Sequence, residues 1–171
     1  MLVEKSLVSA RVSRIAVGKS KRKMNMKKLI GLGLAAALGL SAWGEVLDTS
    51  VFTRACTFTL SGYQGASTLV DFPVLVRLDR TIPGFDPACC GANGAGLRFA
   101  DEAGNLLAHE VDTWDVSGES CVWVRVPSLS GTNTKIRLYC GAADGAQLPA
   151  VSSRDVWSKY IMVAHGGANG V

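Results

Sequence analysis

The sequence predicts an all-β protein, an antiparallel β-sandwich of jelly-roll-like arrangement, preceded by a helical N-terminal segment. From residue 51 onward, several segments alternate apolar and polar residues with a period of two, which places alternate side chains on opposite faces of a strand. No segment combines a sustained 3.6-residue apolar period with helix caps. Short strands separated by turn residues are typical of a sandwich.

The helical N-terminal segment is interpreted as a secretory signal peptide. Two lysines precede residues 29–40, a run of twelve residues without a charge, and Ala42 and Gly44 then supply the small side chains that a signal peptidase accepts. We predict cleavage between Gly44 and Glu45. An uncleaved transmembrane anchor is the alternative, but at 1.5 Å per residue the run falls well short of the roughly 30 Å hydrocarbon core.

The chain is expected to have four parts. Residues 1–23 form a basic leader, which we interpret as a start codon assigned too early, since Met24 and Met26 could each begin a signal peptide of ordinary length. We assign residues 24–44 to the signal peptide and residues 45–160 to the β-sandwich domain. Residues 161–171 are then a linker or the start of a truncated following domain.

Charge is distributed unevenly along the chain. The whole sequence has 18 Lys and Arg, 14 Asp and Glu, and a formal net charge of +4. Residues 1–44 hold nine basic residues and one acid, so the remaining residues hold nine basic and thirteen acidic residues, a net charge of −4. We therefore expect no nucleic-acid partner, and membrane contact only through the signal peptide during export.

The strands can be placed from the alternation and from β-branched and aromatic content. A turn is expected at residues 101–105, and the Ser/Gly/Asn-containing loop at 127–134 is expected to close a β-hairpin between the strands on either side of it. The expected strands cover residues 56–61, 72–79, 97–99, 106–114, 121–126 and 135–140.

The hairpin predicts which side chains share a face. If Val122, Val124 and Val126 point inward together with Ile136, Leu138 and Cys140, the residues between them point outward. An inward Val111 sends its neighbours outward in the same way. One exposed face would then carry a flat aromatic platform able to stack on sugar rings, with polar partners beside it. The alternative is that loops, the second sheet or a following domain cover these residues. The platform residues are Trp114, Trp123 and Tyr139, with Asp112, Glu110 and Arg125 as hydrogen-bonding partners.

Five cysteines follow the signal peptide, and in an oxidising compartment pairing is expected. Cys121 and Cys140 would point to opposite faces, which disulfide geometry does not allow. At most one of the adjacent Cys89 and Cys90 would bond a distant partner, with Cys56 or Cys140 as candidates. No CxxC spacing is present, so we predict neither a metal site nor a cofactor.

No catalytic constellation can be assembled from the sequence. His109 and Glu110 begin like a zincin motif, but Thr113 stands where the second histidine is required. Gly-x-Ser-x-Gly is absent, and His165 is expected at the surface near the C-terminus. Asp101 and Glu102 lie in a turn without the spacing of an EF-hand calcium site. We expect a protein that is not an enzyme.

Five segments in order resemble the bacterial extracellular family known as domain of unknown function 2341, and the resemblance covers residues 54–165. It implies an all-β exported module, often followed by a lectin-like domain of the laminin-G or concanavalin type, at whose start this chain would be truncated. The family has no established catalytic residues, and the Cys89-Cys90 pair departs from its pattern. The segments are residues 72–78, 96–101 with Gly104, 110–114, 122–127, and Val156-Trp157 with Tyr160, Val163 and His165.

The function expected from the sequence is non-catalytic binding or adhesion at the cell surface, with a polysaccharide or surface glycan as partner. The protein would be exported to the periplasm, the cell surface or the medium. Two alternatives stay open: an accessory domain of a secreted glycan-degrading enzyme, and a purely structural spacer.

Overall fold

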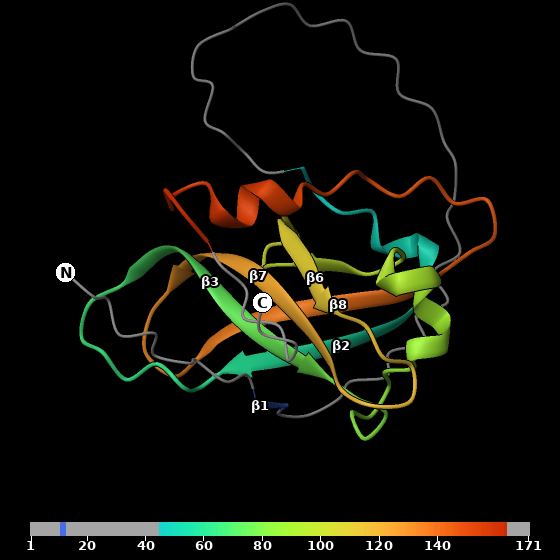
Figure 1. Cartoon of the computed structure of the whole chain (residues 1–171), viewed down its shortest axis with the longest axis horizontal. Helices are drawn as coiled ribbons and strands as arrows, with labels where there is room; N and C mark the ends of the chain where they lie inside the picture. Colours follow the sequence, from blue (N-terminus) through green and yellow to red (C-terminus); the bar gives the residue numbers. More distant parts are fainter. Residues whose placement is uncertain (1–10, 13–44, 164–171) are drawn as a thin grey trace, which may run out of the picture.

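A computed structural model describes residues 11–12 and 45–163 (Figure 1). These residues form eight β-strands and four short 3₁₀ helices, with no α-helix, so the all-β prediction is confirmed for them. The expected signal peptide at 24–44, most of the basic leader, and His165 lie outside the described residues. Within the described part, no helix has the length and apolar character that a membrane span requires. The elements in chain order are β1 (Arg11–Val12), η1 (Thr49–Val51), β2 (Phe52–Leu60), β3 (Leu69–Leu78), η2 (Pro87–Cys90), η3 (Ala92–Gly94), β4 (Arg98–Ala100), β5 (Leu106–Leu107), β6 (His109–Thr113), β7 (Ser120–Leu129), β8 (Thr134–Ala142) and η4 (Ser153–Trp157).

The strands form two antiparallel sheets. One sheet has five strands in the order β1-β2-β8-β4-β5, and the other has three in the order β3-β7-β6. In Figure 1 the ribbons of β3 and β7 cross over those of β2 and β8. This is the arrangement expected of a β-sandwich, in which each sheet turns one apolar face toward the other.

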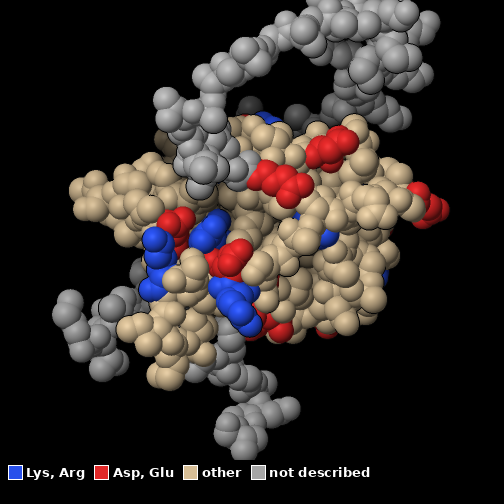
Figure 2. Space-filling model, turned by 90° about the horizontal axis from the view of Figure 1, so that it is seen from above, with Lys and Arg blue, Asp and Glu red and all other residues tan. Residues whose placement is uncertain are grey.

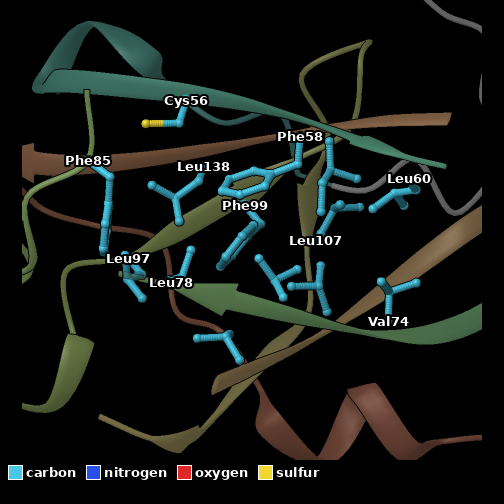
Figure 3. Close-up of a cluster of buried hydrophobic side chains, with 14 of the residues drawn as sticks. Cys56, Phe58, Leu60, Val74, Leu78, Phe85, Leu97, Phe99, Leu107 and Leu138 are labelled. Carbon is cyan, nitrogen blue, oxygen red and sulfur yellow. The ribbon is translucent and has the colours of Figure 1, made fainter. Parts of the chain in front are cut away.

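One hydrophobic core fills the space between the sheets (Figure 3). The period-two alternation correctly predicts which side chains of the four long strands enter it, and each of them is nearly or fully buried. Burying such a side chain stabilises the fold by about 1.5–3 kcal/mol relative to leaving it in water. The inward residues are Cys56, Phe58 and Leu60 on β2, Val74, Val76 and Leu78 on β3, Val122, Val124 and Val126 on β7, and Ile136, Leu138 and Cys140 on β8.

The expected hairpin between residues 121–126 and 135–140 is wrong. Both segments are strands, but β7 pairs with β3 and β6 in the three-stranded sheet, whereas β8 pairs with β2 and β4 in the five-stranded sheet. The connection between β7 and β8 therefore crosses from one sheet to the other. Two strands with inward apolar residues satisfy the same alternation whether they are neighbours in one sheet or face each other across the core.

The single strand expected at 106–114 is in fact two short strands in different sheets. Leu107 on β5 pairs with Phe99 on β4, whereas His109 on β6 pairs with Val124 on β7. The chain changes sheet within one residue, Ala108. The register of β6 against β7 then shifts between Val111 and Thr113, which is the mark of a β-bulge.

Candidate functional site

Tyr139 does not share a face with Trp123, so the expected aromatic platform is not formed as predicted. Tyr139 lies on the outer side of the five-stranded sheet, while Trp123 lies on the outer side of the three-stranded sheet. Tyr139 is only 7% exposed because Phe52 and Leu47 pack on it, with 5.7 Å between the Phe52 and Tyr139 ring centroids.

Trp114 also leaves the expected face, because the bulge in β6 adds one residue to the alternation. Glu110 and Thr113 both lie opposite outward residues of β7, so Asp112 is the inserted residue and Trp114 turns inward. Its indole packs against the core and against Gly94, whose φ is +72°. A Cβ at Gly94 would lie 2.9 Å from Trp114 Cε3, so this position requires glycine both for space and for backbone conformation.

Trp123 remains on the outer face and is partly covered by η4, which packs across β6, β7 and β3. The Trp123 and Trp157 rings meet edge to face, with centroids 5.3 Å apart. The indole N–H of Trp157 donates a hydrogen bond to the carboxylate of Glu110, which lies directly opposite Trp123 in the β6–β7 pair. The ring of Tyr160 packs edge to face on Trp157, with 5.8 Å between the ring centroids. We call Trp123, Trp157 and Tyr160 the aromatic cluster.

Charged side chains border the aromatic cluster. Arg125 on β7 donates a hydrogen bond to Ser158 Oγ at 3.0 Å, and its Nε lies 4.0 Å from Asp71 Oδ1. Lys159 Nζ lies 3.7 Å from the other oxygen of the same carboxylate. Asp71 has a φ of +52°, a left-handed conformation that is uncommon in a strand for any residue except glycine.

Charge on the described surface is mixed in sign. On the face that Figure 2 shows, basic and acidic side chains lie next to one another within a largely uncharged surface.

Asp112, an expected partner of the platform, is exposed at the bulge, where it accepts a hydrogen bond from the Thr113 hydroxyl. Of the expected site residues, the structure therefore brings together Trp123, Glu110 and Arg125.

The residues that complete this arrangement were not among the site residues expected from the sequence. Trp157 and Tyr160 were part of a segment that carried the family resemblance, and that segment was the only sequence signal pointing to them. Asp71 had no such signal, since its place beside Arg125 depends on a left-handed backbone within a strand. Neither the strand alternation nor residue spacing indicates such a conformation.

His109 lies apart from this site and faces the core. Its ring packs edge to face against Phe99 with 5.2 Å between centroids, and its Nδ1 lies 3.3 Å from the carbonyl oxygen of Leu107. Burial lowers the pKa of His109 to about 4, so the imidazole is neutral at physiological pH. Across residues 11–12 and 45–163, no group of three or more His, Cys, Asp or Glu side chains is placed to hold a metal ion.

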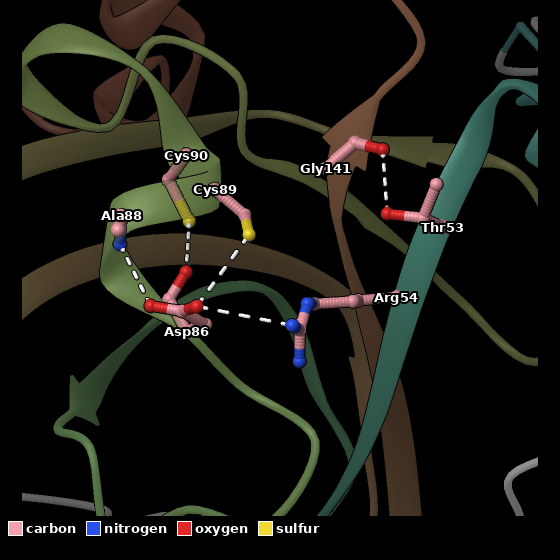
Figure 4. A network of polar contacts seen from close by, with 7 residues as sticks. All are labelled: Thr53, Arg54, Asp86, Ala88, Cys89, Cys90 and Gly141. Atoms are coloured by element: carbon pink, nitrogen blue, oxygen red, sulfur yellow. Dashed lines mark hydrogen bonds and ion pairs between the residues drawn. The ribbon is translucent and has the colours of Figure 1, made fainter.

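The cysteines gather mainly at one corner of the sandwich. All five lie in the described residues and are free thiols there. Cys89 and Cys90 lie on η2, above Asp86 (Figure 4), and Cys90 belongs to the same buried cluster as Cys140 of β8. The Asp86 carboxylate also lies 3.8 Å from the guanidinium of Arg54 on β2. Cys121, by contrast, lies on the three-stranded sheet.

Comparison with known proteins supports the family resemblance. The sequence model of one protein family, described as Domain of unknown function (DUF2341), matches residues 93–155. This stretch covers β4 through β8 and reaches η4. No curated protein and no solved structure matches the chain significantly.

Proposed function

We propose that the chain is an exported, non-catalytic β-sandwich module that binds a polysaccharide or surface glycan through the outer face of its three-stranded sheet. The observation that carries the proposal is the aromatic cluster, which extends outward from Trp123 on the sheet through Trp157 to Tyr160, whose side chain is 45% exposed. Aromatic rings in this setting offer apolar faces on which a sugar ring can stack.

Polar groups suited to sugar hydroxyls lie beside these rings. The carboxylates of Glu110 and Asp71 can accept hydrogen bonds, and the guanidinium of Arg125 can donate them. A few placed polar groups next to an apolar surface are what a carbohydrate site requires for orientation and specificity. The proposed site therefore keeps Trp123, Glu110 and Arg125 from the sequence hypothesis. It replaces Trp114 and Tyr139 with Trp157 and Tyr160, leaves out Asp112 and adds Asp71.

Binding of the purified full chain to a panel of bacterial and plant polysaccharides tests the proposal, by glycan array and then by affinity electrophoresis. Replacing Tyr160 with alanine should weaken binding about tenfold, which corresponds to about 1.4 kcal/mol. Tyr160→Phe keeps the ring and should keep most of the affinity. Val116→Ala, which trims another exposed apolar side chain, is the matched control and should leave binding unchanged. Absence of binding to every polysaccharide would overturn the proposal.

A structural spacer is the second candidate, and one observation favours it. The hydrogen bonds from Trp157 to Glu110 and from Arg125 to Ser158 fasten the segment after β8 to the outer sheet face. A spacer needs such fastening to fix the direction in which the chain continues. If no glycan binds and Trp157→Ala only loosens this segment, the spacer is the better account. An accessory role beside a glycan-degrading domain would instead show as binding to that domain's own substrate.

A further inference from the structure

The corner where η2 meets the end of β8 encloses two cysteines from distant parts of the chain. Cys90 on η2 and Cys140 on β8 are both 0% exposed. The two elements are in van der Waals contact here, since a Cβ added to Gly141 would lie 3.7 Å from the Cβ of Cys89. The packing therefore holds η2 directly against the last residues of β8.

The backbone of Asp86 lies beside both thiols. Its carbonyl oxygen accepts a hydrogen bond from Cys90 Sγ at 3.5 Å, and its N–H donates to the sulfur of Cys140. The two thiols are near enough to perturb each other, since Cys140 raises the pKa of Cys90 and Cys90 lowers the pKa of Cys140. The Asp86 side chain in turn accepts from the N–H of Ala88, which fixes the start of η2 (Figure 4). The fold thus places the two thiols in the same buried cluster, where η2 packs against β8.

We propose that Cys90 and Cys140 form an intramolecular disulfide that ties η2 to β8 when the chain matures under oxidising conditions. Two buried thiols on elements that pack directly against each other meet the first geometric requirement for such a bond. The bond would close a loop from β4 through β8, which is also the part of the chain that matches the family. This inference is independent of the proposed glycan binding.

The remaining cysteines are less well placed to form a disulfide with Cys140. Cys56 pairs across the sheet with Leu138, and Cys140 pairs with Arg54, so Cys56 and Cys140 are diagonal neighbours. Diagonal positions put Cβ atoms about 7 Å apart, whereas a disulfide needs roughly 3.5–4.5 Å. Cys56 Sγ instead lies 3.6 Å from the carbonyl oxygen of Pro83.

Cys89 and Cys121 are excluded as disulfide partners of Cys140. The side chain of Cys89 points elsewhere, and Cys121 lies in the other sheet. Cys89 Sγ lies 3.6 Å from the carboxylate of Asp86, on the side of that residue that faces Arg54. Cys121 lies on β7, where its nearest charged neighbours are Arg77 and Glu119. The expectation from the sequence left Cys56 and Cys140 open as partners, and the structure favours Cys140 paired with Cys90.

The chemistry is thiol–disulfide exchange with a small or protein disulfide as oxidant. In the open chain either cysteine can react first, and the steps are the same if the first is Cys140. Its thiolate attacks one sulfur of the oxidant, forms a mixed disulfide and releases one thiolate. Cys90 then loses its proton and attacks Cys140 Sγ, which releases the second thiolate. Two protein thiols are oxidised and one oxidant disulfide is reduced to two thiols.

Burial of both sulfurs sets when this exchange occurs. Since neither is accessible in the folded protein, the oxidant must meet them in the open chain, before η2 closes on β8. The finished bond should then resist reductants under native conditions and yield to them only after denaturation.

Oxidative refolding of the full chain tests this inference. The reduced, denatured protein is refolded with oxidised glutathione, alkylated under denaturing conditions without reductant, and analysed by mass spectrometry. Two of the five cysteines should escape alkylation. After trypsin digestion, the peptides 81–98 and 138–154 should be joined, and reductant should separate them. The oxidised protein should also melt at a higher temperature than the reduced protein.

Alanine variants identify the pair, because the first peptide contains both Cys89 and Cys90. Cys90→Ala should abolish the joined peptide and the difference in melting temperature. Cys89→Ala and Cys56→Ala, the matched controls, should retain both. The proposal is overturned if the refolded wild-type chain has five alkylated cysteines, or if the joined peptide survives in Cys90→Ala.

Discussion

Trp157 packs edge to face on Trp123, with ring planes at 63°, and so attaches a 3₁₀ helix near the C-terminus to the outer face of a sheet formed by β3, β7 and β6. Trp157 also donates its indole N–H to Glu110 of β6. A single side chain thereby joins the aromatic surface of one strand to the carboxylate of its neighbour. The segment that follows Trp157 depends on this contact for its position.

Replacing Trp157 with alanine should therefore loosen the C-terminal segment more than it destabilises the sandwich. The loss of a half-buried indole and its hydrogen bond is expected to lower the free energy of unfolding by about 1–3 kcal/mol. Trypsin should cleave after Lys159 several times faster than in the wild type. Urea denaturation measures the first effect and limited proteolysis the second. Val116→Ala should change neither, and an unchanged cleavage rate in Trp157→Ala would contradict the packing described.

Stability should fall as the pH falls from about 6.5 to about 4, because of His109. Burial lowers its pKa to about 4 in the folded protein, whereas the unfolded chain has the ordinary value near 6.5. The unfolded state therefore binds more protons within this window. The contribution of neutral His109 to the free energy of unfolding is fully present above about pH 6.5. About 3 kcal/mol of it is lost as the pH approaches 4.

Urea denaturation at a series of pH values measures this effect. His109→Gln should flatten the profile between pH 4 and 6.5, and His165→Gln should leave it unchanged. The carboxylates of Asp48 and Asp79 have a pKa lowered by hydrogen bonds from Ser50 and Thr81, so they titrate below this window. A profile for His109→Gln as steep as that of the wild type would rule out the histidine as its cause.

Asp71 should tolerate asparagine better than valine. Asparagine adopts the left-handed conformation with φ of +52° and loses only the charge, so Asp71→Asn should cost under about 1 kcal/mol. Valine loses the same charge and is strained at positive φ, which should add about 1–2 kcal/mol. Urea denaturation in low and high salt separates the cost of the lost charge from the cost of backbone strain, since salt screens only the charge interaction. Equal costs for both variants would contradict the backbone assignment.

Export should be accompanied by cleavage between Gly44 and Glu45. N-terminal sequencing of the protein recovered outside the cytoplasm should begin at Glu45. Ala42→Lys should block processing, because a charged side chain does not fit the small pocket of a signal peptidase, while Val46→Lys, just past the cleavage site, should be processed. Recovery of an intact leader on the exported wild-type chain would refute the interpretation.

The sequence predicted the core well because the alternation of polar and apolar residues reflects burial directly. Phe58 and Ile136 were placed inward and are fully buried. Alternation does not reveal which strands share a sheet, so Trp123 and Tyr139 were wrongly expected on one face. Sheet membership depends on long-range pairing, here of β7 with β3 and of β8 with β2.

The candidate site was predicted only in part, for a local reason. The inserted Asp112 reverses the direction of Trp114 without changing the residue types around it. The same alternation therefore fits a regular strand and a bulged one equally well. Trp157 contacts Trp123 through a segment with no periodic pattern, so strand periodicity does not indicate this contact.

The pairing of Arg11–Val12 with β2 determines what removal of residues 1–44 would expose. These two residues form the outermost strand of the five-stranded sheet and cover the free side of β2 at Phe58 and Thr59. If translation starts at Met1, rather than at Met24 or Met26, and processing then removes residues 1–44, β2 becomes the edge of that sheet, with unpaired N–H and C=O groups along it. The step that releases the protein would then also uncover a strand open to pairing with another chain.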